Sequence, residues 1–488
     1  MKKRIGLFVA KWVFHQQVID SAIELTNSGY YVDIFLYGNT SINIDDPIKN
    51  PYINVMDFTF DKDFVLPLNK SNHLFNKEYT SQFKDRKLII FGTGNLAKKA
   101  LKKLNNQEVS YVVDNNSDKW GSYFINHKIY NPSKIHTENR SEVFILVASS
   151  YYSEIKQQLE DNGFKEGENF DNILNLLEAQ MFENYTTEKT IQYINGKEYS
   201  YFVGFEKIGM IWAGIISKNY NIPYMYYSLE LYTSDHPMWE PGRYRLLHNV
   251  EKHFHNQACA TIIQDKSRRD VLFKDNDIVE QETLYVTVSI REEVKKSENY
   301  FDRKYKISPS KIKVLYWGMI AENRYCDEII KVAQELDEGY QFIIHGIYYD
   351  EGYYNYLKTL DKKNKVVFST ELLSVESKQV VIDSVDIGLC FYKEAPLNDK
   401  LTVYSSEKIA RFLQSGKPII TFDYDNYKIA IDEGEFGTYI SSIKQMSTAL
   451  DELVKNYEYY SINARKIYQE KYNFINQFKK VINFINRN

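Results

Sequence analysis

Ser405, Ser406 and Lys408 lie at the start of a predicted helix within VYSSEKIARFLQSGKPIITFD, residues 403–423. The first N–H groups of a helix have no partner inside the helix, and with the helix dipole they attract anions. The two hydroxyls and the ammonium add donors and positive charge, a combination that suits a diphosphate. A serine here can instead simply cap the helix, and for an isolated Ser-Ser-x-Lys that explanation is the commoner one.

A second basic position follows another predicted strand. The stretch YWGMIAENR carries Gly318 directly after the strand and Arg324 just before the next helix. A glycine lets the backbone approach a phosphate closely, and an arginine can bind a phosphate with two parallel hydrogen bonds. Taken alone, the pair could also be a loop glycine and a solvated arginine.

Three residues in the first half of the chain are candidate catalytic groups: His15, Glu206 and Glu230. Each follows a predicted strand, and in an open parallel sheet ligands bind outside the carboxyl ends of the strands. One of them could deprotonate a hydroxyl as a general base or orient it. Alternatively, Glu230 pairs with a core arginine and His15 caps a helix. Asp265, Arg268 and Arg269 also follow a strand and are expected at the same edge.

A Gly-x-Gly-x-x-Ala turn occurs in FGTGNLAKKAL, with Gly92, Gly94 and Ala97 after a predicted strand. Asp114 ends the next strand, about 20 residues later, which is the spacing of a dinucleotide-binding fingerprint. The turn on its own is a weak signal, because such glycine patterns also occur without a ligand.

A histidine-rich segment, LLHNVEKHFHNQ, places His248, Glu251 and His255 on one face of a predicted helix. The set could mimic metal ligands, but it lacks the His-Glu-x-x-His spacing of a helical zinc site. A solvated or interface helix face is the favoured interpretation, and no metal site is predicted in the chain.

The composition excludes several classes of protein. The 488 residues carry a formal net charge of -4, so bulk electrostatics do not favour nucleic acid as a partner. No apolar stretch approaches the ~20 residues of a membrane span, although peripheral contact with a membrane surface stays compatible. Three widely spaced cysteines match no metal pattern, and together with the absence of a signal peptide they indicate a cytoplasmic protein.

Strands alternate with helices along most of the chain, which predicts an α/β fold with parallel, doubly wound sheets. The charged, proline-containing segment FDRKYKISPSK is interpreted as a linker. The predicted parts are a discontinuous N-terminal Rossmann-like domain (1–60 and 180–300), an inserted Rossmann-like domain (86–175), a C-terminal domain (310–470) and a C-terminal helix (471–488).

The order of motifs in the C-terminal domain is more specific than any one of them. LYWGMIAENR, FIIHG, VVFSTELL, VDIGLCFY and SSEKIARFLQSGKPII follow one another. This order resembles the donor domain of GT-B glycosyltransferases, in particular the family-4-like group, over about residues 310 to 440. Residues of about 1–60 and 180–280 match the group more loosely. The resemblance implies two facing Rossmann-like domains, with the additional small α/β domain inserted in the first.

By this resemblance, the chain is a metal-independent glycosyltransferase of the hexosyltransferase type. It would transfer a sugar from a nucleotide-diphosphate sugar, a UDP-sugar being favoured, to a saccharide or lipid-linked acceptor. Its setting would be bacterial surface polysaccharide synthesis at the inner face of the membrane. No cofactor is required, because cations and a helix terminus can neutralise the departing diphosphate. The implied donor-binding residues are Gly318, Arg324, Thr370, Glu371, Leu372, Ser405, Ser406, Glu407 and Lys408.

One position departs from the family pattern. Arg411 stands where the group usually has the glutamate that binds the donor ribose, and an arginine cannot accept hydrogen bonds from a diol. Either Glu407 substitutes, or the nucleotide is held differently, or catalysis is impaired. The loop KEAPLNDK could supply donor-sugar contacts from Glu394, Asn398 or Asp399, or it could be an ordinary surface turn.

The inserted segment resembles the small Rossmann-like domain of sialic-acid-type sugar O-acetyltransferases. The matching residues are the glycine turn, Asp114-Asn115-Asn116, Lys119-Trp120-Gly121, Pro132 and Ala148-Ser149-Ser150. The resemblance implies a structural or sugar-nucleotide-sensing role rather than use of a cofactor. Two alternatives to the transferase remain: a non-catalytic sugar-nucleotide binding protein, and an NAD-dependent oxidoreductase that uses the inserted domain. The oligomeric state is not predicted.

Overall fold

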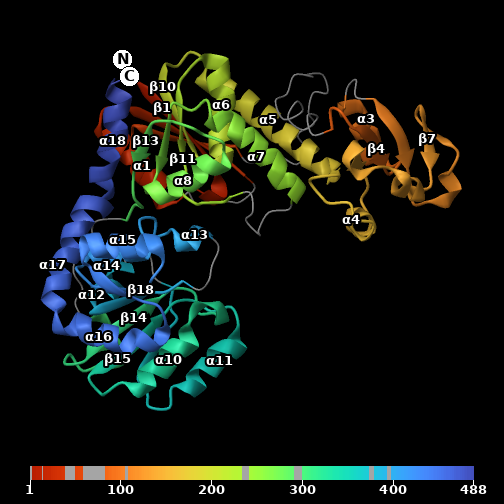
Figure 1. The fold of residues 1–488 in the computed structure, drawn as a ribbon. Helices are drawn as coiled ribbons and strands as arrows, with labels where there is room; N and C mark the ends of the chain where they lie inside the picture. The colour runs from red at the N-terminus through yellow and green to blue at the C-terminus, as the bar shows by residue number, and fades with distance from the viewer. Residues whose placement is uncertain are drawn as a thin grey trace.

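The computed structural model describes residues 3–13, 15–38, 50–58, 83–104, 108–233, 241–290, 299–372, 378–392 and 397–487. Within these residues the strands form three sheets, of seven, six and six strands. The first and last parts of the chain build two domains that face each other, and the third sheet lies apart from both (Figure 1). We call these the N-terminal, C-terminal and inserted domains.

The N-terminal domain contains a seven-stranded sheet in the order β13-β12-β11-β10-β1-β2-β3. Its neighbouring strands are all parallel. The strands are β1 (Arg4–Ala10), β2 (Tyr31–Tyr37), β3 (Ile53–Phe58), β10 (Tyr199–Phe205), β11 (Tyr224–Tyr227), β12 (Ala260–Ile263) and β13 (Thr283–Tyr285). The helices are α1 (Gln16–Asn27), α5 (Ile173–Ile194), α6 (Glu206–Tyr220), α7 (Pro241–His255), α8 (Lys266–Asp275) and α18 (Phe474–Arg487).

Successive side chains of β1 point to opposite faces of the sheet and so enter two different cores. Ile5, Leu7 and Val9 lie in the core that also contains buried residues of α1 and α18. Phe8 points to the other side and packs against Trp212 of α6, with ring centroids 5.0 Å apart. Because both faces of a parallel sheet are covered by helices, its strands are apolar throughout, as the run RIGLFVA predicts.

The junction between β10 and α6 is a sharp turn that requires two glycines. A Cβ on Gly204 would lie 2.3 Å from the Met210 Cα, and one on Gly209 would lie 2.1 Å from the Phe8 carbonyl oxygen. Between them Glu206 adopts a left-handed conformation with φ of 57°. Such a backbone is strained for a residue with a side chain, and it fixes where the Glu206 carboxylate points.

The C-terminal domain contains a parallel six-stranded sheet in the order β16-β15-β14-β17-β18-β19. Its strands are β14 (Ile312–Trp317), β15 (Tyr340–His345), β16 (Val366–Ser369), β17 (Ile387–Cys390), β18 (Ile419–Phe422) and β19 (Gly437–Ile440). Its helices are α9 (Tyr300–Tyr305), α10 (Cys326–Glu335), α11 (Glu351–Leu360), α12 (Lys378–Asp383), α13 (Leu397–Lys400), α14 (Glu407–Gln414), α15 (Asp425–Gly434), α16 (Met446–Lys455) and α17 (Tyr457–Ile467). After a π-helical turn, α18 crosses back and packs on the N-terminal domain (Figure 1).

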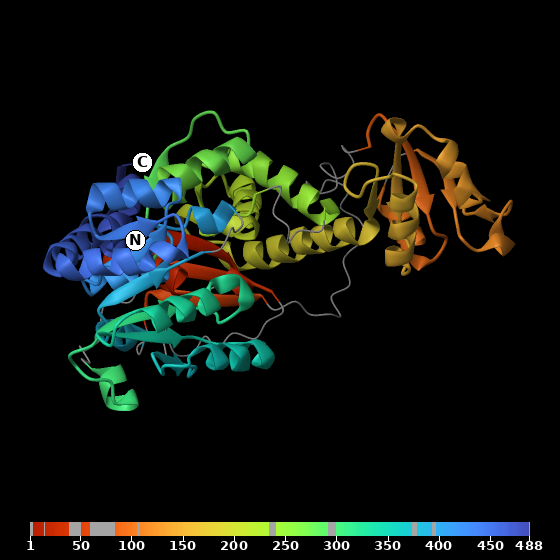
Figure 2. The same cartoon turned by 60° about the horizontal axis from the view of Figure 1, so that its bottom comes forward.

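The inserted domain has the strand order β6-β7-β5-β4-β8-β9, parallel except for the β6–β7 pair. Its strands are β4 (Lys87–Phe91), β5 (Val109–Val113), β6 (Tyr123–Phe124), β7 (His127–Tyr130), β8 (Val143–Val147) and β9 (Phe170–Asn172), and its helices are α3 (Asn95–Lys103) and α4 (Tyr152–Asp161). In both ribbon views it lies at the far end of α5 (Figure 2). One apolar cluster continues from this domain through Leu176 and Phe182 of α5 to α6.

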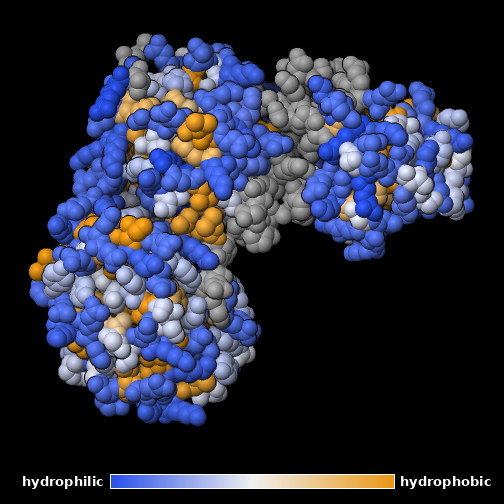
Figure 3. Space-filling view, viewed as in Figure 1, coloured by the Kyte–Doolittle hydropathy of each residue, from blue (hydrophilic) through white to orange (hydrophobic). Residues whose placement is uncertain are grey.

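The visible surface is largely hydrophilic, with apolar residues also present where the N-terminal and C-terminal domains meet (Figure 3). Among the residues that the structure describes, no helix combines the length and apolar character needed to span a bilayer.

The predicted linker FDRKYKISPSK is wrong in its first half. Residues Tyr300–Tyr305 form α9, and Phe301 is completely buried in the core of the C-terminal domain. Asp302 forms an ion pair with Lys313 of β14 at 3.1 Å. Charge density suggested a solvated segment, but the apolar side chain within it decides the packing.

The crossing of α6 over β1 predicts a strong effect of a single methyl group. Gly209→Ala should lower the free energy of unfolding by about 1–3 kcal/mol, because the added Cβ overlaps a backbone carbonyl that cannot move aside. Denaturant titration of the whole chain measures this. Gly94→Ala is the control, since a Cβ there meets nothing within 4 Å. Equal stability of the two variants would contradict the described crossing.

Candidate functional site

The loops after the strands of the N-terminal and C-terminal domains contact each other directly. The Thr287 hydroxyl donates to the Tyr404 carbonyl at 2.8 Å, and the Asn398 amide nitrogen donates to Glu230 Oε2 at 2.8 Å. These contacts join segments more than 100 residues apart in sequence. We call this line of contacts the seam.

Arg268 lies at the centre of the seam and is completely buried. Its guanidinium donates to the Leu229 carbonyl at 2.8 Å in its own domain, and to Ser405 Oγ at 3.2 Å in the other. Burial lowers the pKa of Arg268, while the charge of Glu230 opposes that shift. Arg268 was expected at this edge, but its contacts across the seam were not predicted.

Glu206 is a buried carboxylate that shapes the loop after β11. Its Oε1 accepts hydrogen bonds from the backbone N–H groups of Leu229 and Glu230, the latter at 2.7 Å. Burial raises the pKa of Glu206 to about 7, although these two hydrogen bonds lower it. Glu206 therefore positions the neighbouring Glu230, which is exposed at the seam.

Glu230 was expected either to act in catalysis or to pair with a core arginine. Among the described residues its partner is the Asn398 amide instead. The Oδ1 of the same amide accepts from the Leu231 N–H at 2.9 Å.

His15 caps the N-terminus of α1, as one of its two alternatives predicted. Its Nδ1 accepts the Gln17 N–H at 3.1 Å, which assigns the proton of the neutral ring to Nε2. Partial burial lowers the pKa of His15, and the charge of Glu407 from the other domain opposes this. A neutral His15 can therefore donate a hydrogen bond into the seam, but its Nε2 cannot accept a proton.

Lys408 and Arg324 are brought close to the same tyrosine of the C-terminal domain. The Lys408 ammonium lies 5.6 Å from the centre of the Tyr316 ring. Burial raises the pKa of Tyr316 well above its usual range, and the positive charge of Arg324 opposes this shift. Lys408 forms no ion pair with any described residue, whereas Arg324 lies 3.6 Å from Asp399 Oδ2. Half-buried cations without a strong partner are suited to bind an anion.

Ser405 and Ser406 have different hydrogen-bond partners. Ser406 is the N-cap of α14 and accepts from the Ile409 N–H at 3.3 Å, so the capping explanation is correct for it. Ser405 is the partner of Arg268.

Arg411, at the position that departs from the family pattern, is 1% exposed. Its Nε donates to Glu407 Oε1 at 2.9 Å, and Lys378 contacts the same oxygen at 3.2 Å. Burial alone would raise the pKa of Glu407, but the charges of Arg411 and Lys378 lower it. Glu407 is thus an ionised carboxylate held at the first turn of α14.

Gly318 lies where two loops nearly touch. A Cβ on Gly346 would lie 1.7 Å from the Gly318 carbonyl oxygen, so the ends of β14 and β15 approach each other closely. After β16, Glu371 forms an ion pair with Lys304, Thr370 is half-buried, and Leu372 is 84% exposed. The position of these three residues near the nucleobase of the donor stays a prediction. Glu394 lies outside the described residues.

Solved structures similar to this chain share the arrangement of the two facing domains. Sucrose-phosphate synthase from Thermosynechococcus elongatus is 10% identical with a TM-score of 0.57, and the match covers 100% of this chain and 99% of that one. A structure from E. coli described as trehalose-6-phosphate bound with UDP-2-fluoro glucose has 7% identity and a TM-score of 0.55, covering 99% of each chain. This chain has the GT-B glycosyltransferase fold.

A third GT-B structure is TarM from S. aureus in complex with Fondaparinux, alpha-GlcNAc-glycerol and UDP. It is 13% identical with a TM-score of 0.50, and the match covers 99% of this chain and 100% of TarM. At such identities the likeness extends to the fold alone. No curated protein sequence matches the chain.

The inserted domain matches a family model described as C2185-like, N-terminal, over residues 84–170. Its glycine turn lines a cavity of about 720 Å³ that also includes Asp114. Thr93 Oγ1 and Lys119 Nζ lie 2.5 and 3.1 Å from Asp114 Oδ2, and the Asn116 N–H donates to Oδ1 at 2.9 Å. Oδ1 of Asp114 accepts only one of these bonds and can accept another, so the NAD alternative stays open.

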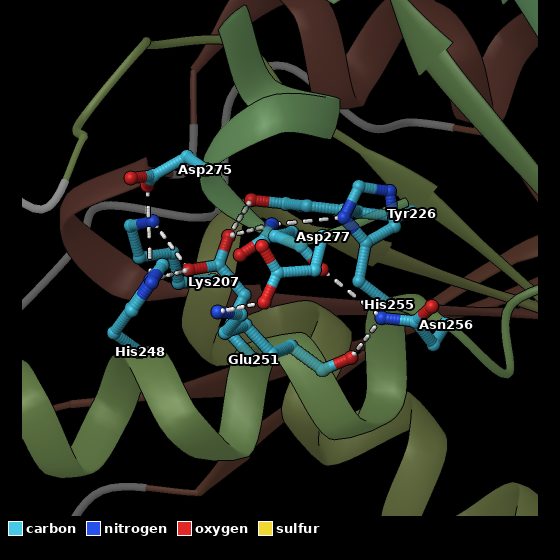
Figure 4. Close-up of polar contacts among 10 residues, drawn as sticks. Lys207, Tyr226, His248, Glu251, His255, Asn256, Asp275 and Asp277 are labelled. Atoms are coloured by element: carbon cyan, nitrogen blue, oxygen red, sulfur yellow. Dashed lines mark hydrogen bonds and ion pairs between the residues drawn. The ribbon is translucent and has the colours of Figure 1, made fainter. Parts of the chain in front are cut away.

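Of the two alternatives for the histidine face, solvated and interface, the solvated one is wrong, because Glu251 and His255 are completely buried among contacts to Tyr226 and other polar residues (Figure 4). Lys207 forms an ion pair with Glu251, and the Tyr226 hydroxyl donates to Glu251 at 3.0 Å. Burial lowers the pKa of His255 to about 3, so its ring is neutral. The cluster is a structural network, and no group of described residues has the arrangement of a metal site.

The sequence did not identify Gln17 as a support of the seam residue Thr287. Its side-chain nitrogen donates to the Tyr227 hydroxyl at 2.5 Å and to the Thr287 carbonyl at 3.0 Å. The available signal was a polar residue on the apolar face of the predicted first helix.

The raised pKa of Glu206 predicts a pH-dependent effect on stability. The fold favours the protonated acid, so its stability contribution is full below pH 4.5 and is lost as the pH rises to about 7. The difference between these two values corresponds to about 3 kcal/mol. Glu206→Gln, which stays neutral, should therefore raise Tm at pH 8 and change it little near pH 5.

Glu251→Gln is the matched contrast for this measurement. Burial raises the pKa of Glu251, but Lys207 and His248 lower it to about 2, and its contribution is therefore present at neutral pH and lost only in acid. This variant should lower Tm at pH 8. A pH-independent Tm difference for Glu206→Gln between pH 5 and 8 would contradict the assignment.

Proposed function

We propose that the protein is a glycosyltransferase of the hexosyltransferase type. It transfers a sugar from a nucleotide-diphosphate sugar, most simply a UDP-sugar, to a saccharide or lipid-linked acceptor. The observation that carries the proposal is that two cations, Lys408 and Arg324, lie on the GT-B donor domain, while Glu230 and His15 of the other domain lie at the seam it forms. The UDP ligands of TarM and the E. coli structure support this donor class.

The donor diphosphate would lie between Lys408, Arg324 and the start of α14. As the bond to the sugar breaks, negative charge grows on the diphosphate, and fixed positive charges stabilise it without reorganising. This removes the need for a metal ion. Gly318 would allow the backbone to approach the phosphates closely.

The acceptor would enter from the N-terminal domain. Glu230 is exposed, and its backbone N–H donates to Glu206. It would orient or deprotonate the acceptor hydroxyl. His15, neutral at pH 7 with its proton on Nε2, would donate a hydrogen bond to the sugar or to a phosphate oxygen. Synthesis of a surface polysaccharide at the inner face of a bacterial membrane is the proposed setting.

Glu407 would take the place of the missing ribose-binding glutamate. Arg411 and Lys378 hold it ionised, and an ionised carboxylate accepts two hydroxyl donors from a diol.

A non-catalytic sugar-nucleotide binding protein is the second candidate function, since Arg411 in place of the usual glutamate could have cost the chain its activity.

Binding of nucleotides tests the donor site. Thermal shift of the intact protein against UDP, GDP, CMP, ADP, their common sugar conjugates and NAD(P) should give stabilisation by one nucleoside diphosphate. Lys408→Ala and Arg324→Ala should each weaken that binding at least 10-fold, because each removes a charge-assisted contact to phosphate. Lys331→Ala, on the surface of α10, is the control.

Two other outcomes would point elsewhere. Stabilisation by NAD alone, abolished by Gly94→Val, would overturn the transferase and move the chemistry to the inserted domain. Intact binding of a nucleotide sugar without release of the nucleotide, even by slow hydrolysis, would favour the binding protein.

A role of Glu407 at the ribose predicts discrimination between ligands. Glu407→Gln should weaken UDP at least 10-fold but leave pyrophosphate binding nearly unchanged, because pyrophosphate has no ribose. Calorimetry with both ligands measures this. Equal losses for the two ligands would mean that Glu407 acts on the phosphate-binding cations rather than on the nucleoside.

A further inference from the structure

The one-turn helix α13 (Leu397–Lys400) contacts both sides of the seam within two consecutive residues. Figure 1 shows it at the junction between the N-terminal and C-terminal domains. Asn398 contacts the loop after β11, and Asp399 contacts Arg324 of the donor side. A movement of this short helix therefore changes contacts on both sides at once.

Asn398 clamps the acceptor-side loop with both ends of its amide. The nitrogen donates to Glu230 Oε2 at 2.8 Å, and the oxygen accepts from the Leu231 N–H at 2.9 Å. Only one orientation of the amide satisfies both bonds. While the clamp is closed, Glu230 Oε2 is engaged by a protein donor, and the carboxylate is held in one orientation.

Asp399 balances the charge of Arg324 only loosely. The two groups are 3.6 Å apart, and their side chains are 24% and 29% exposed respectively. A diphosphate carries more negative charge than a carboxylate and can bind a guanidinium with two parallel hydrogen bonds. It would therefore displace Asp399 from Arg324.

The C-terminal end of α13 is anchored independently of these contacts. The Asp399 carbonyl accepts from Thr402 Oγ1 at 3.0 Å, and Thr402 bonds to the Tyr427 hydroxyl at 2.6 Å. The helix can thus loosen at the side chains of Asn398 and Asp399 without detaching from its domain.

We propose that α13 is a relay that makes the release of Glu230 depend on the donor site. This rests on the proposed function, because the ligand that opens the relay is the donor diphosphate. When the diphosphate binds Arg324, Asp399 is released, α13 loosens, and Asn398 frees both Glu230 and the Leu231 N–H. Without a donor, Glu230 and the Leu231 N–H stay clamped. Asn398 is a positioning residue in this scheme.

Hydrogen–deuterium exchange of the Leu231 amide in the intact protein tests the relay. In the ligand-free protein, Asn398→Ala and Asp399→Asn should each raise its exchange rate at least 10-fold, since either change opens the clamp. UDP should raise the rate of the wild-type protein similarly and add nothing in Asp399→Asn. Lys400→Ala, the next residue of α13, is the control and should behave like the wild type.

Calorimetry on the same proteins gives the reciprocal effect. Asp399→Asn should bind UDP about 3–10-fold more tightly, because the competing carboxylate is gone and linkage is symmetric. Pyrophosphate, which carries the diphosphate without a nucleoside, is the second probe and should gain similarly.

The outcomes separate the relay from the function. If Asp399→Asn leaves Leu231 exchange unchanged in the ligand-free protein, the relay is wrong whatever UDP does. If UDP binds but does not alter exchange in the wild type, the relay is wrong while the donor class stands. If neither pyrophosphate nor any nucleoside diphosphate of the thermal-shift panel binds, the proposed function fails and donor control of α13 fails with it.

Discussion

The relative placement of the two facing domains depends on a buried positive charge. Arg268 forms no ion pair with a described residue, and removing a cation from water costs several kcal/mol unless its N–H groups are satisfied. Its terminal nitrogens donate to the Leu229 carbonyl in its own domain and, in the other, to Ser405 and at 3.5 Å to the Leu401 carbonyl, while its Nε has no partner among the described residues. Of the placements that keep Arg268 buried, the closed seam is one that gives both terminal nitrogens a partner, and this favours it over placements that bury the charge without them.

This constraint reaches the site from both directions. Leu229, which accepts from Arg268 through its carbonyl, donates through its N–H to Glu206. Ser405, which accepts from Arg268, directly precedes the N-cap of α14 and so sets the position of Lys408. The Arg268 guanidinium thus links the loop that carries Glu230 to the segment that precedes Lys408, alongside the Thr287–Tyr404 and Asn398–Glu230 contacts.

The sequence predicted those features that interactions between neighbouring residues determine. Alternating strands and helices, the helix start at Ser406 and the GT-B fold follow from periodicity, capping and motif order. The histidine face shows the limit: periodicity correctly placed Glu251 and His255 on one side of a helix, but it could not reveal that Lys207, Tyr226 and Asn276 contact them there. The seam was beyond prediction for the same reason, because its partners, such as Asn398 and Glu230, are 168 residues apart and no local pattern links them.

Arg411 changes where negative charge lies on α14. It stands at the position of the carboxylate in the resembled pattern, and it forms an i, i+4 ion pair with Glu407, about one turn earlier. A helix rises about 1.5 Å per residue, so the negative charge is displaced by about 6 Å toward the start of the helix. There it lies closer to Lys408 and to the proposed diphosphate site. If Glu407 binds the ribose as proposed, the ribose would sit nearer the phosphates than in the usual pattern, and the nucleoside conformation, rather than the phosphate contacts, would distinguish this donor site.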